Sequence, residues 1–357
     1  MIIDKADNYD VIIVGQGLAG SLLAWQLIKS GKRVFVIDNH HHQAASSVAS
    51  GLFNPVTGRR LHSEQNVQEL IACAISTYRV LEIEFDDKLF IPLDMHRIAR
   101  SIADHELWLK RRSEPIYRHL LGAWLHDQPY SLRGEFGGFA QLSCHRLDIA
   151  KLLHHIKGFL IRSRCYSAEK VDYDDITCND KLARVNNRSA NIVIFCEGHQ
   201  ARHNPWFNDI QWDISRGDIL HFESDATLPM IVNNGYNYIP ISAHEFHWGS
   251  SFEHNASNPL PNKKGLTQLL DKLEETDTRA ESYTLLAQYS GLRAATRDKR
   301  PAIGVHPELN TLGIFNGFGA RGSLLIPFYA HHFSQVLNQR HTLINDVDWR
   351  RYASVQT

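Results

Sequence analysis

DVIIVGQGLAGSLLAWQLIKSGKRVFVID, residues 10–38, is the stretch that sets the architecture of this chain. Val11–Val14 is a short run rich in β-branched residues, which is typical of a strand buried on both faces. Apolar residues at helical spacing then predict a helix over Leu18–Lys29, and Val34–Ile37 is expected to be a second strand. The stretch therefore predicts the beginning of a Rossmann-type α/β domain.

Three glycines stand in the turn between the first strand and the helix. Their spacing, G-x-G-x-x-G, lets a backbone turn tightly and approach a pyrophosphate, whose charge is stabilised by N–H groups at the helix start. An acid ends the second strand about 20 residues further on, where it can accept hydrogen bonds from ribose hydroxyls. We therefore predict a dinucleotide site formed by Gly15, Gly17, Leu18, Ala19, Gly20 and Asp38.

Composition narrows the class of protein. The chain has 357 residues, enough for about two domains, and a formal net charge of −1. Lys and Arg form no long run, so the total charge does not favour nucleic acid as a partner. No stretch is long and apolar enough to span a bilayer, and the first residues do not resemble a signal peptide. We expect a cytoplasmic protein that contacts no membrane.

Cysteine and histidine predict neither a disulfide nor a metal site. The five cysteines are an odd number without C-x-x-C spacing, as expected for reduced thiols in a reducing compartment. Three of the 21 histidines are consecutive, His40–His42, and consecutive side chains cannot all converge on one metal ion. We expect a polar loop at these residues.

The rest of the chain alternates between two kinds of pattern. Helices are predicted over residues 64–85, 146–159, 262–276 and 320–337. Short strands are predicted within residues 89–98, 136–142, 191–196, 217–252 and 312–315, with a glycine turn at 317–319. The start, middle and end of the chain have α/β character, and two blocks of antiparallel character separate them.

This alternation predicts an α/β fold, α+β overall, with two domains. Residues 1–85, 143–215 and 290–357 are assigned to one discontinuous dinucleotide-binding domain. Residues 86–142 and 216–289 are assigned to an antiparallel-sheet cap domain for the substrate.

The last third of the chain carries a second, longer pattern. YSGLRAATRDKRPAIGVHPELNTLGIFNGFGARGSLLIP spans residues 289–327. It contains Gly-Leu-Arg, then T-R-D-x-x-P-x-I-G, and after a short gap a strand and a glycine-rich turn that opens a helix. This pattern resembles the carboxyl-terminal signature of the D-amino-acid-oxidase-like family of flavoproteins. Three further stretches match the family: Ala49–Gly51, IVIFCEGHQA (192–201) and SRGDIL (215–220).

Within this family the motifs resemble most the oxidase domain of the bifunctional tRNA enzyme that completes methylaminomethyl-uridine. Glycine and sarcosine oxidases are also similar, but less so around Arg321. No part of the sequence resembles the methyltransferase domain of the bifunctional enzyme, and the balanced charge does not favour tRNA.

The resemblance implies a glutathione-reductase-like FAD-binding domain. It implies noncovalent FAD, because residues 298–318 contain no cysteine of the kind that tethers flavin in sarcosine-oxidase relatives. Val171 and Gly198 are expected near the adenosine half of the cofactor. The flavin is expected to lie along Ser46, Ala49, Ser50 and Gly51, with its N1/C2 edge facing Gly317, Gly319, Ala320, Arg321, Gly322 and Ser323.

Amine oxidation in this family is described as hydride transfer from the substrate α-carbon to flavin N5, in which positioning carries most of the catalysis. Arg293 matches the family arginine and is expected to bind a substrate carboxylate bidentately, unless it forms a structural ion pair with Asp298 or a neighbour. Arg321 lies in the first turn of a helix, where a cation needs an anion close by. Tyr238 is the third candidate, with a place in the core as the alternative.

The sequence therefore predicts an FAD-dependent oxidoreductase that oxidises the C–N bond of a small amino acid or N-substituted glycine to an imine. Two alternatives stay open. One is a tRNA wobble-uridine oxidase acting on a carboxymethylamino group, and the other is a non-catalytic flavoprotein that senses redox state.

Overall fold

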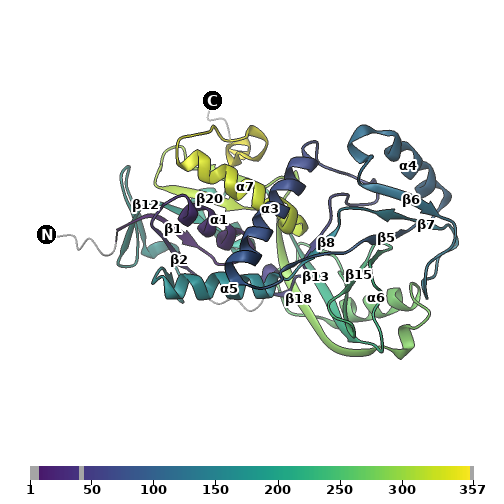
Figure 1. Ribbon diagram of the computed structural model, residues 1–357. Helices are drawn as coiled ribbons and strands as arrows, with labels where there is room; N and C mark the ends of the chain where they lie inside the picture. Colours follow the sequence, from purple (N-terminus) through teal and green to yellow (C-terminus); the bar gives the residue numbers. More distant parts are fainter. Residues whose placement is uncertain (1–7, 40–43, 354–357) are drawn as a thin grey trace. The chain divides into compact units, whose positions relative to one another are not determined.

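The computed structural model describes residues 8–39 and 44–353, which form two compact units (Figure 1). Unit 1 comprises the described residues of 1–47, 149–215 and 292–357. Unit 2 comprises residues 48–148 and 216–291.

Unit 1 is built on an eight-stranded sheet whose centre is parallel. Strand β1 (Asn8–Val14) lies between β2 (Val34–Ile37) and β12 (Arg188–Phe195) and runs parallel to both. Strand β20 (Leu312–Asn316) continues the parallel order beyond β12. The remaining strands are β9 (Tyr166–Ser167), β10 (Ile176–Cys178), β11 (Ala183–Val185) and β19 (Ala302–Val305).

Two helices of unit 1 pack against its first helix. Helix α1 (Leu18–Lys29) contacts both α5 (Ile149–Arg162) and α7 (Gly322–Leu337). All four residues of β2 and the last four of β1 are buried, as the apolar runs predicted. The strand–turn–helix–strand order confirms the Rossmann-type expectation for residues 10–38.

Unit 2 is dominated by a nine-stranded sheet. Its order is β17 (Glu253–His254), β13 (Trp212–Glu223), β16 (Glu245–Gly249), β15 (Asn237–Pro240), β14 (Ile231–Asn233), β5 (Met95–Ile98), β7 (Gly138–Gln141) and β6 (Leu121–Leu125), with β18 (Thr284–Thr296) paired to β13. From β13 through β16 and β15 to β14, and from β5 through β7 to β6, neighbouring strands pair antiparallel, whereas β14 and β5 pair in parallel. Strands β14 and β5 come from two separate chain segments, and their parallel pairing is a feature that the expected antiparallel cap did not include.

The rest of unit 2 covers this sheet and forms a second, smaller one. Helix α6 (Lys263–Glu274) packs against β16, and Trp248 Nε1 donates to Leu269 O at 2.8 Å. A three-stranded sheet contains β3 (Leu52–Phe53), β8 (His145–Leu147) and β4 (Phe90–Pro92). The other helices are α2 (Ala45–Val48), which crosses from unit 1, α3 (Val67–Phe85) and α4 (Ile102–Ser113).

Short 3-10 turns complete the described chain: η2 (Pro115–Tyr117), η3 (Tyr173–Asp175), η4 (Gly198–His203), η5 (Pro205–Phe207), η6 (Ala280–Ser282), η7 (Gly319–Arg321), η8 (Asn345–Val347) and η9 (Trp349–Tyr352).

Residues 48–85 differ from the sequence-based division, which placed them in the dinucleotide domain. They belong to unit 2, because β3 pairs with β8 and α3 contacts β4. Sequence patterns alone missed this division, since the strands β3 and β8, which pair with each other, lie far apart in the chain. They also missed the long strand β18, which carries Arg293.

Candidate functional site

The glycine turn between β1 and α1 is packed as tightly as its sequence predicts. Gly15 has φ of +102°, and a Cβ atom there would lie 2.4 Å from Cys196 O. A Cβ on Gly20 would lie 1.9 Å from Gly15 O. Neither position can hold a side chain, because the turn packs directly against the backbone of Cys196 and of Gly15 itself.

The beginning of helix α1 is suited to an anion. Gly17 is the N-cap and has no side-chain cap, and the first turn, with Leu18 and Ala19, contains no acid. Leu18 N donates to Ser46 Oγ at 3.1 Å, so a neutral hydroxyl from unit 1 flanks the helix end. A helix start without a capping carboxylate fits the pyrophosphate of a dinucleotide.

Asp38 lies beside this turn, directly after β2. Its Oδ1 accepts a hydrogen bond from Gln16 N at 2.9 Å, which fixes the carboxylate next to the glycines. This position agrees with the ribose role expected for it, which stays a prediction. The neighbouring His40–His42 lie outside the described residues.

The loop expected to line the flavin is anchored within unit 2 by its own contacts. Gly51 has φ of +74°, and its carbonyl accepts a hydrogen bond from Leu147 N at 2.8 Å. Ser50 Oγ lies 3.1 Å from His247 Nδ1 on β16. Ala49, Ser50 and Gly51 belong to unit 2, whereas Ser46 belongs to unit 1.

The second glycine turn follows β20 in unit 1. Gly317 has φ of +84°, Gly319–Arg321 form η7, and α7 begins at Gly322 with Ser323 buried. The helix therefore begins two residues later than predicted, because the residues from Gly319 wind as a 3-10 turn. No acid lies in the first turn of α7, so this helix start is also suited to an anion.

Arg293 lies near the end of β18, between a residue that bridges to Ala44 and a residue that bridges to Phe318. A parallel bridge joins Ala44 to Leu292, and an antiparallel bridge joins Ala295 to Phe318. A Cβ on Gly319 would lie 3.3 Å from Ala295 Cβ. Alternate strand residues share a face, so half-buried Arg293 points to the same side as Ala295, toward the turn.

Asp298 was considered as an ion-pair partner for Arg293, but its carboxylate pairs with Arg351. Its carboxylate accepts from Arg351, with Nε at 2.7 Å and Nη2 at 3.2 Å. Arg321, the second candidate cation, donates from Nη2 to Lys299 O at 2.8 Å and so links the turn to the loop after β18. The predicted ligand role of Arg321 stays untested.

Tyr238, the third candidate, lies in the core of unit 2. It is 1% exposed, stacks on Phe246 with ring centroids 4.2 Å apart, and accepts a hydrogen bond from Leu228 N at 3.1 Å. Burial raises the pKa of its hydroxyl to about 12. Tyr238 belongs to the core between the large sheet and α6, which is the alternative place considered for it, and its catalytic role stays a prediction.

Gly198 and Val171 lie near the carboxyl end of β12 and beside the core of unit 1. Gly198 has φ of +56° and its carbonyl accepts from Asn316 Nδ2 at 2.8 Å. Val171 packs partly buried against the core around Phe195. Their expected place near adenosine stays a prediction.

Glu197, which precedes Gly198, has a raised pKa that was not predicted from the sequence. Its carboxylate accepts hydrogen bonds from Tyr173 OH at 3.1 Å and Asn204 Nδ2 at 3.0 Å. Burial raises its pKa to about 7, although these two hydrogen bonds oppose the shift. The only signal in the sequence was an acid at the end of an apolar strand.

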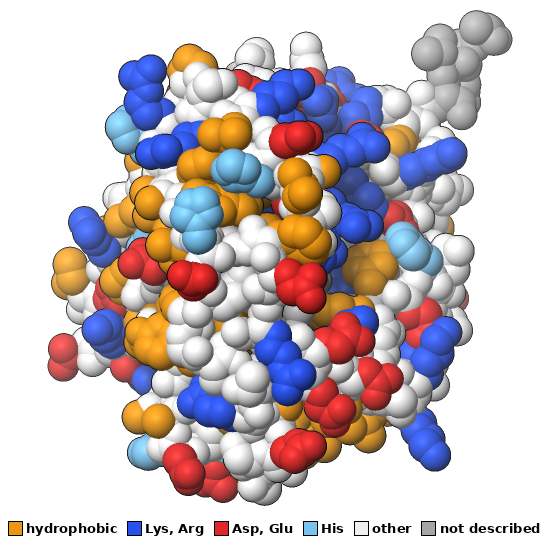
Figure 2. Space-filling view, turned by 90° about the vertical axis from the view of Figure 1, so that its right-hand side faces the viewer, with side chains coloured by type: hydrophobic (Ala, Val, Ile, Leu, Met, Phe, Trp, Pro, Cys, Tyr) orange, Lys and Arg blue, Asp and Glu red, His pale blue; other side chains and the backbone are white. Residues whose placement is uncertain are grey.

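An arginine strip crosses one face of unit 2. Arg97 Nη2 donates to Gly58 O at 2.6 Å, and Arg111 donates to Arg60 O through Nε at 3.3 Å and Nη2 at 3.2 Å. We define the strip as Arg97 and Arg111, which these contacts join to the loop, together with Arg59 and Arg60 of the loop and Arg100 beside Arg97. Figure 2, which views the side where α4 lies in Figure 1, shows Lys and Arg side chains gathered in a band.

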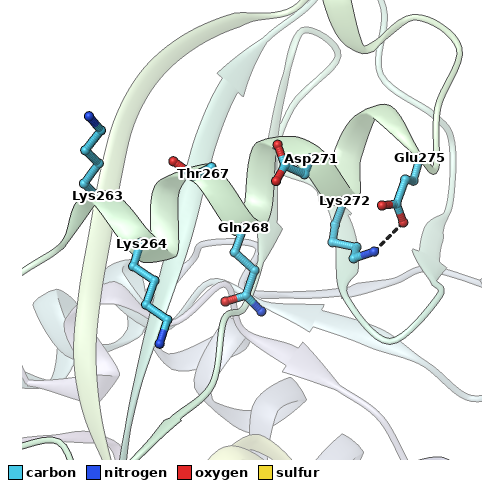
Figure 3. Close-up of a pocket in the computed structure, with 7 residues that line it drawn as sticks. All are labelled: Lys263, Lys264, Thr267, Gln268, Asp271, Lys272 and Glu275. Atoms are coloured by element: carbon cyan, nitrogen blue, oxygen red, sulfur yellow. Dashed lines mark hydrogen bonds and ion pairs between the residues drawn. The ribbon is translucent and has the colours of Figure 1, made fainter.

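A shallow hollow of about 630 Å³ also lies along α6 in unit 2 (Figure 3). Its lining comes from this one helix and the residue that follows it: Lys263, Lys264, Thr267, Gln268, Asp271, Lys272 and Glu275. Lys272 and Glu275 pair with each other across it. None of the predicted site residues lies there, so this hollow is not the candidate site.

The strand–turn–helix of unit 1, with an acid beside the turn, defines a dinucleotide-binding α/β protein. A family model described as "FAD dependent oxidoreductase" (DAO) matches residues 10–336. The chain belongs to this family. The predictions of the family, of FAD as the cofactor and of an FAD-dependent oxidoreductase are therefore confirmed.

Individual relatives are distant but cover most of the chain. Glycine oxidase from Bacillus licheniformis is 24% identical over 344 residues, which are 90% of this chain and 90% of the relative. The tRNA 5-methylaminomethyl-2-thiouridine biosynthesis bifunctional protein MnmC from Leptospira interrogans is 23% identical over 88% of this chain and 55% of its own length. The chain thus spans only about half of that relative.

A solved structure supports the fold. The crystal structure of glycine oxidase from Geobacillus kaustophilus superposes with a TM-score of 0.81 at 17% identity, covering 99% of this chain and 100% of the other. The predicted fold class is thereby confirmed. Within residues 8–39 and 44–353, no helix has the length and apolarity needed to cross a bilayer. The same residues contain no cluster of three metal-ligating side chains.

Proposed function

We propose that this chain oxidises the C–N bond of a small amino acid or an N-substituted glycine. A hydride leaves the substrate carbon, the nitrogen loses a proton, and the resulting imine is hydrolysed in water. FAD, when bound, supplies the acceptor for the hydride. A relative named glycine oxidase supports this substrate class, and so does the placement of Arg293.

The position of Arg293 on β18 is the observation on which the proposal rests. This residue lies on the stretch of β18 bridged to Ala44 at one end and to Phe318 at the other. A guanidinium on this face can bind a substrate carboxylate through two parallel N–H bonds. Fixing the carboxylate also fixes the direction of the reacting C–H bond, which is the main demand of hydride transfer.

The glycine turn and the start of α7 have a different task in this proposal. A helix start without an acid stabilises negative charge that develops on a neighbouring group. Gly317, Gly319, Ala320, Gly322 and Ser323 are the residues we assign to the flavin edge, and Gly15, Gly17, Gly20 and Asp38 to the adenine dinucleotide half. The cofactor is held without a covalent bond in this proposal.

The test is anaerobic bleaching of the bound flavin by glycine, sarcosine and proline. Bleaching by one of them, with the imine-derived carbonyl product, supports the proposal. Arg293→Leu should raise KM for a carboxylate substrate at least about a hundredfold, as expected when about 3 kcal/mol of charged hydrogen bonding is lost. Arg293→Lys keeps the charge without the fork and should lie in between. An unchanged KM in Arg293→Leu contradicts the assignment.

A second candidate function, tRNA wobble-uridine oxidation, is favoured by the arginine strip. Arg59, Arg60 and Arg100 are exposed, and a row of exposed guanidinium groups is the kind of surface that neutralises a phosphate backbone. The balanced total charge conceals this local concentration. A relative named MnmC supports the same candidate.

The two candidates differ in what reduces the flavin. Bleaching only by a tRNA that bears the carboxymethylamino group, weakened by salt and by Arg59→Ala/Arg60→Ala, selects the second candidate. Bleaching by free amino acids that is insensitive to both changes selects the first. No bleaching by either class of substrate selects a non-catalytic flavoprotein.

We also propose the cytoplasm as its location. All five cysteines are free, with Cys144 and Cys196 buried, which agrees with a reducing compartment. Fractionation of cells followed by detection of the protein tests this assignment.

A further inference from the structure

Ser50 and His247 are brought together by the fold of unit 2. They are 197 positions apart, and Ser50 Oγ lies 3.1 Å from His247 Nδ1. The next residue, Gly51, is held by the hydrogen bond from Leu147 N and would have no room for a Cβ, which would lie 1.7 Å from Leu147 O. The backbone of this loop is therefore anchored at Gly51, and the hydroxyl of Ser50 is anchored separately by His247.

His247 occupies the face of the large sheet opposite to α6. Its neighbours Phe246 and Trp248 are buried in the core with α6, so the alternation of β16 turns His247 to the other side. There it faces its register partner His221, with ring centroids 4.9 Å apart and planes at 86°. His221 Nε2 lies 3.0 Å from Glu245 Oε2.

These contacts form a continuous row from the sheet to the loop: Glu245, His221, His247 and Ser50. The imidazole of His247 is confined by His221 on one side and by Ser50 on the other. Burial lowers the pKa of His247 to about 4, with His221 and Arg146 adding to the shift and Asp148 opposing it. A neutral imidazole at neutral pH has one donor nitrogen and one acceptor nitrogen.

A hydroxyl bonded to such a group has a fixed orientation. If Nδ1 accepts, Ser50 presents its lone pairs to its remaining neighbours; if Nδ1 donates, Ser50 presents its proton. In both cases the protein, and not the ligand, decides what Ser50 offers. No net charge is added to the loop.

We propose that His247 is a positioning residue for the flavin, which fixes the hydroxyl of Ser50 in the loop that lines the isoalloxazine and so tunes its binding and its absorption. The inference rests on the proposed placement of Ala49–Gly51 along the flavin. It is independent of the identity of the substrate, because it concerns the cofactor alone.

The test compares the affinity for FAD and the visible spectrum of the bound flavin in five variants. His247→Leu removes the hydrogen bond, and His247→Gln moves the polar group away from the Nδ1 position. His247→Asn keeps a polar group near that position. Ser50→Ala and the double variant Ser50→Ala/His247→Leu complete a cycle. His244→Leu, an exposed histidine in the turn before β16, is the matched control.

His247→Leu is expected to raise the Kd of apoprotein for FAD about fivefold, the worth of one hydrogen bond, and to shift the flavin absorption bands. His247→Asn should restore both values, and His244→Leu should change neither. The double variant should bind FAD no more weakly than Ser50→Ala, because His247 acts through Ser50. Should His247→Leu fail to fold, His247→Gln takes its place in the cycle.

Additive losses in the double variant would overturn the proposal, since they would show that His247 acts by another route. An unshifted spectrum in both His247→Leu and His247→Gln would overturn it as well. Neither measurement uses an amine, so failure here is distinguishable from failure of the proposed amine oxidation.

Discussion

Replacing Glu197 by glutamine should change how the stability of the protein depends on pH. Glu197 is half-buried just after β12, and desolvation of its carboxyl group raises its pKa from 4.5 to about 7. Between these two values the folded protein holds a proton that the unfolded chain has released. Stability from this group is therefore greatest at low pH and falls as the pH rises toward 7.

The size of the effect follows from the two pKa values. A displacement from 4.5 to about 7 corresponds to about 3 kcal/mol of unfavourable free energy when the buried group is ionised. Glutamine is uncharged and retains an oxygen that can accept from Tyr173 OH. Glu197→Gln should therefore unfold with a free energy close to the parent at pH 5 and about 2 to 3 kcal/mol above it at pH 8.

The assay is urea denaturation of both proteins at pH 5 and pH 8 with the same excess of free FAD. Other titrating groups, including buried His96 and the half-buried His145 and His247, are common to both proteins and cancel in the difference. The exposed Glu308→Gln is the matched control and should show no such change with pH. An equal difference between Glu197→Gln and the parent at both pH values would refute the reasoning.

Three further predictions concern the glycine turn, Tyr238 and the attachment of the flavin. Gly20→Ala places a Cβ within 1.9 Å of Gly15 O, so the purified protein should lack the yellow colour of bound flavin; a normal flavin content would contradict the tight turn. Tyr238→Phe removes the hydrogen bond to Leu228 N and should lower the free energy of unfolding by about 1 kcal/mol while leaving kcat and KM unchanged; a large loss of kcat would support a catalytic role for Tyr238. Denaturation with acid should release all the flavin into the supernatant, and a yellow pellet would show a covalent bond.

The sequence alone predicted the local parts of this protein. Residues 10–38 predict a strand, a turn, a helix and a strand, because each of these elements depends on spacing within a few residues. The structure has β1, α1 and β2 at those places. The glycines at 15 and 20 were also predictable, since only a missing side chain permits such close backbone approach. The motif of residues 289–327 pointed to the family in the same way.

Tertiary structure decided the rest, because the deciding contacts join residues that are far apart in the chain. Tyr238 belongs to a core completed by α6, and residues 48–85 belong to unit 2 because β3 pairs with β8. Ser50 meets His247 across 197 positions, and Glu197 acquires its raised pKa from burial that the local sequence does not encode. Local spacing determines the strands, the glycine turn and the helix of residues 10–38, whereas long-range packing determines which distant side chains meet.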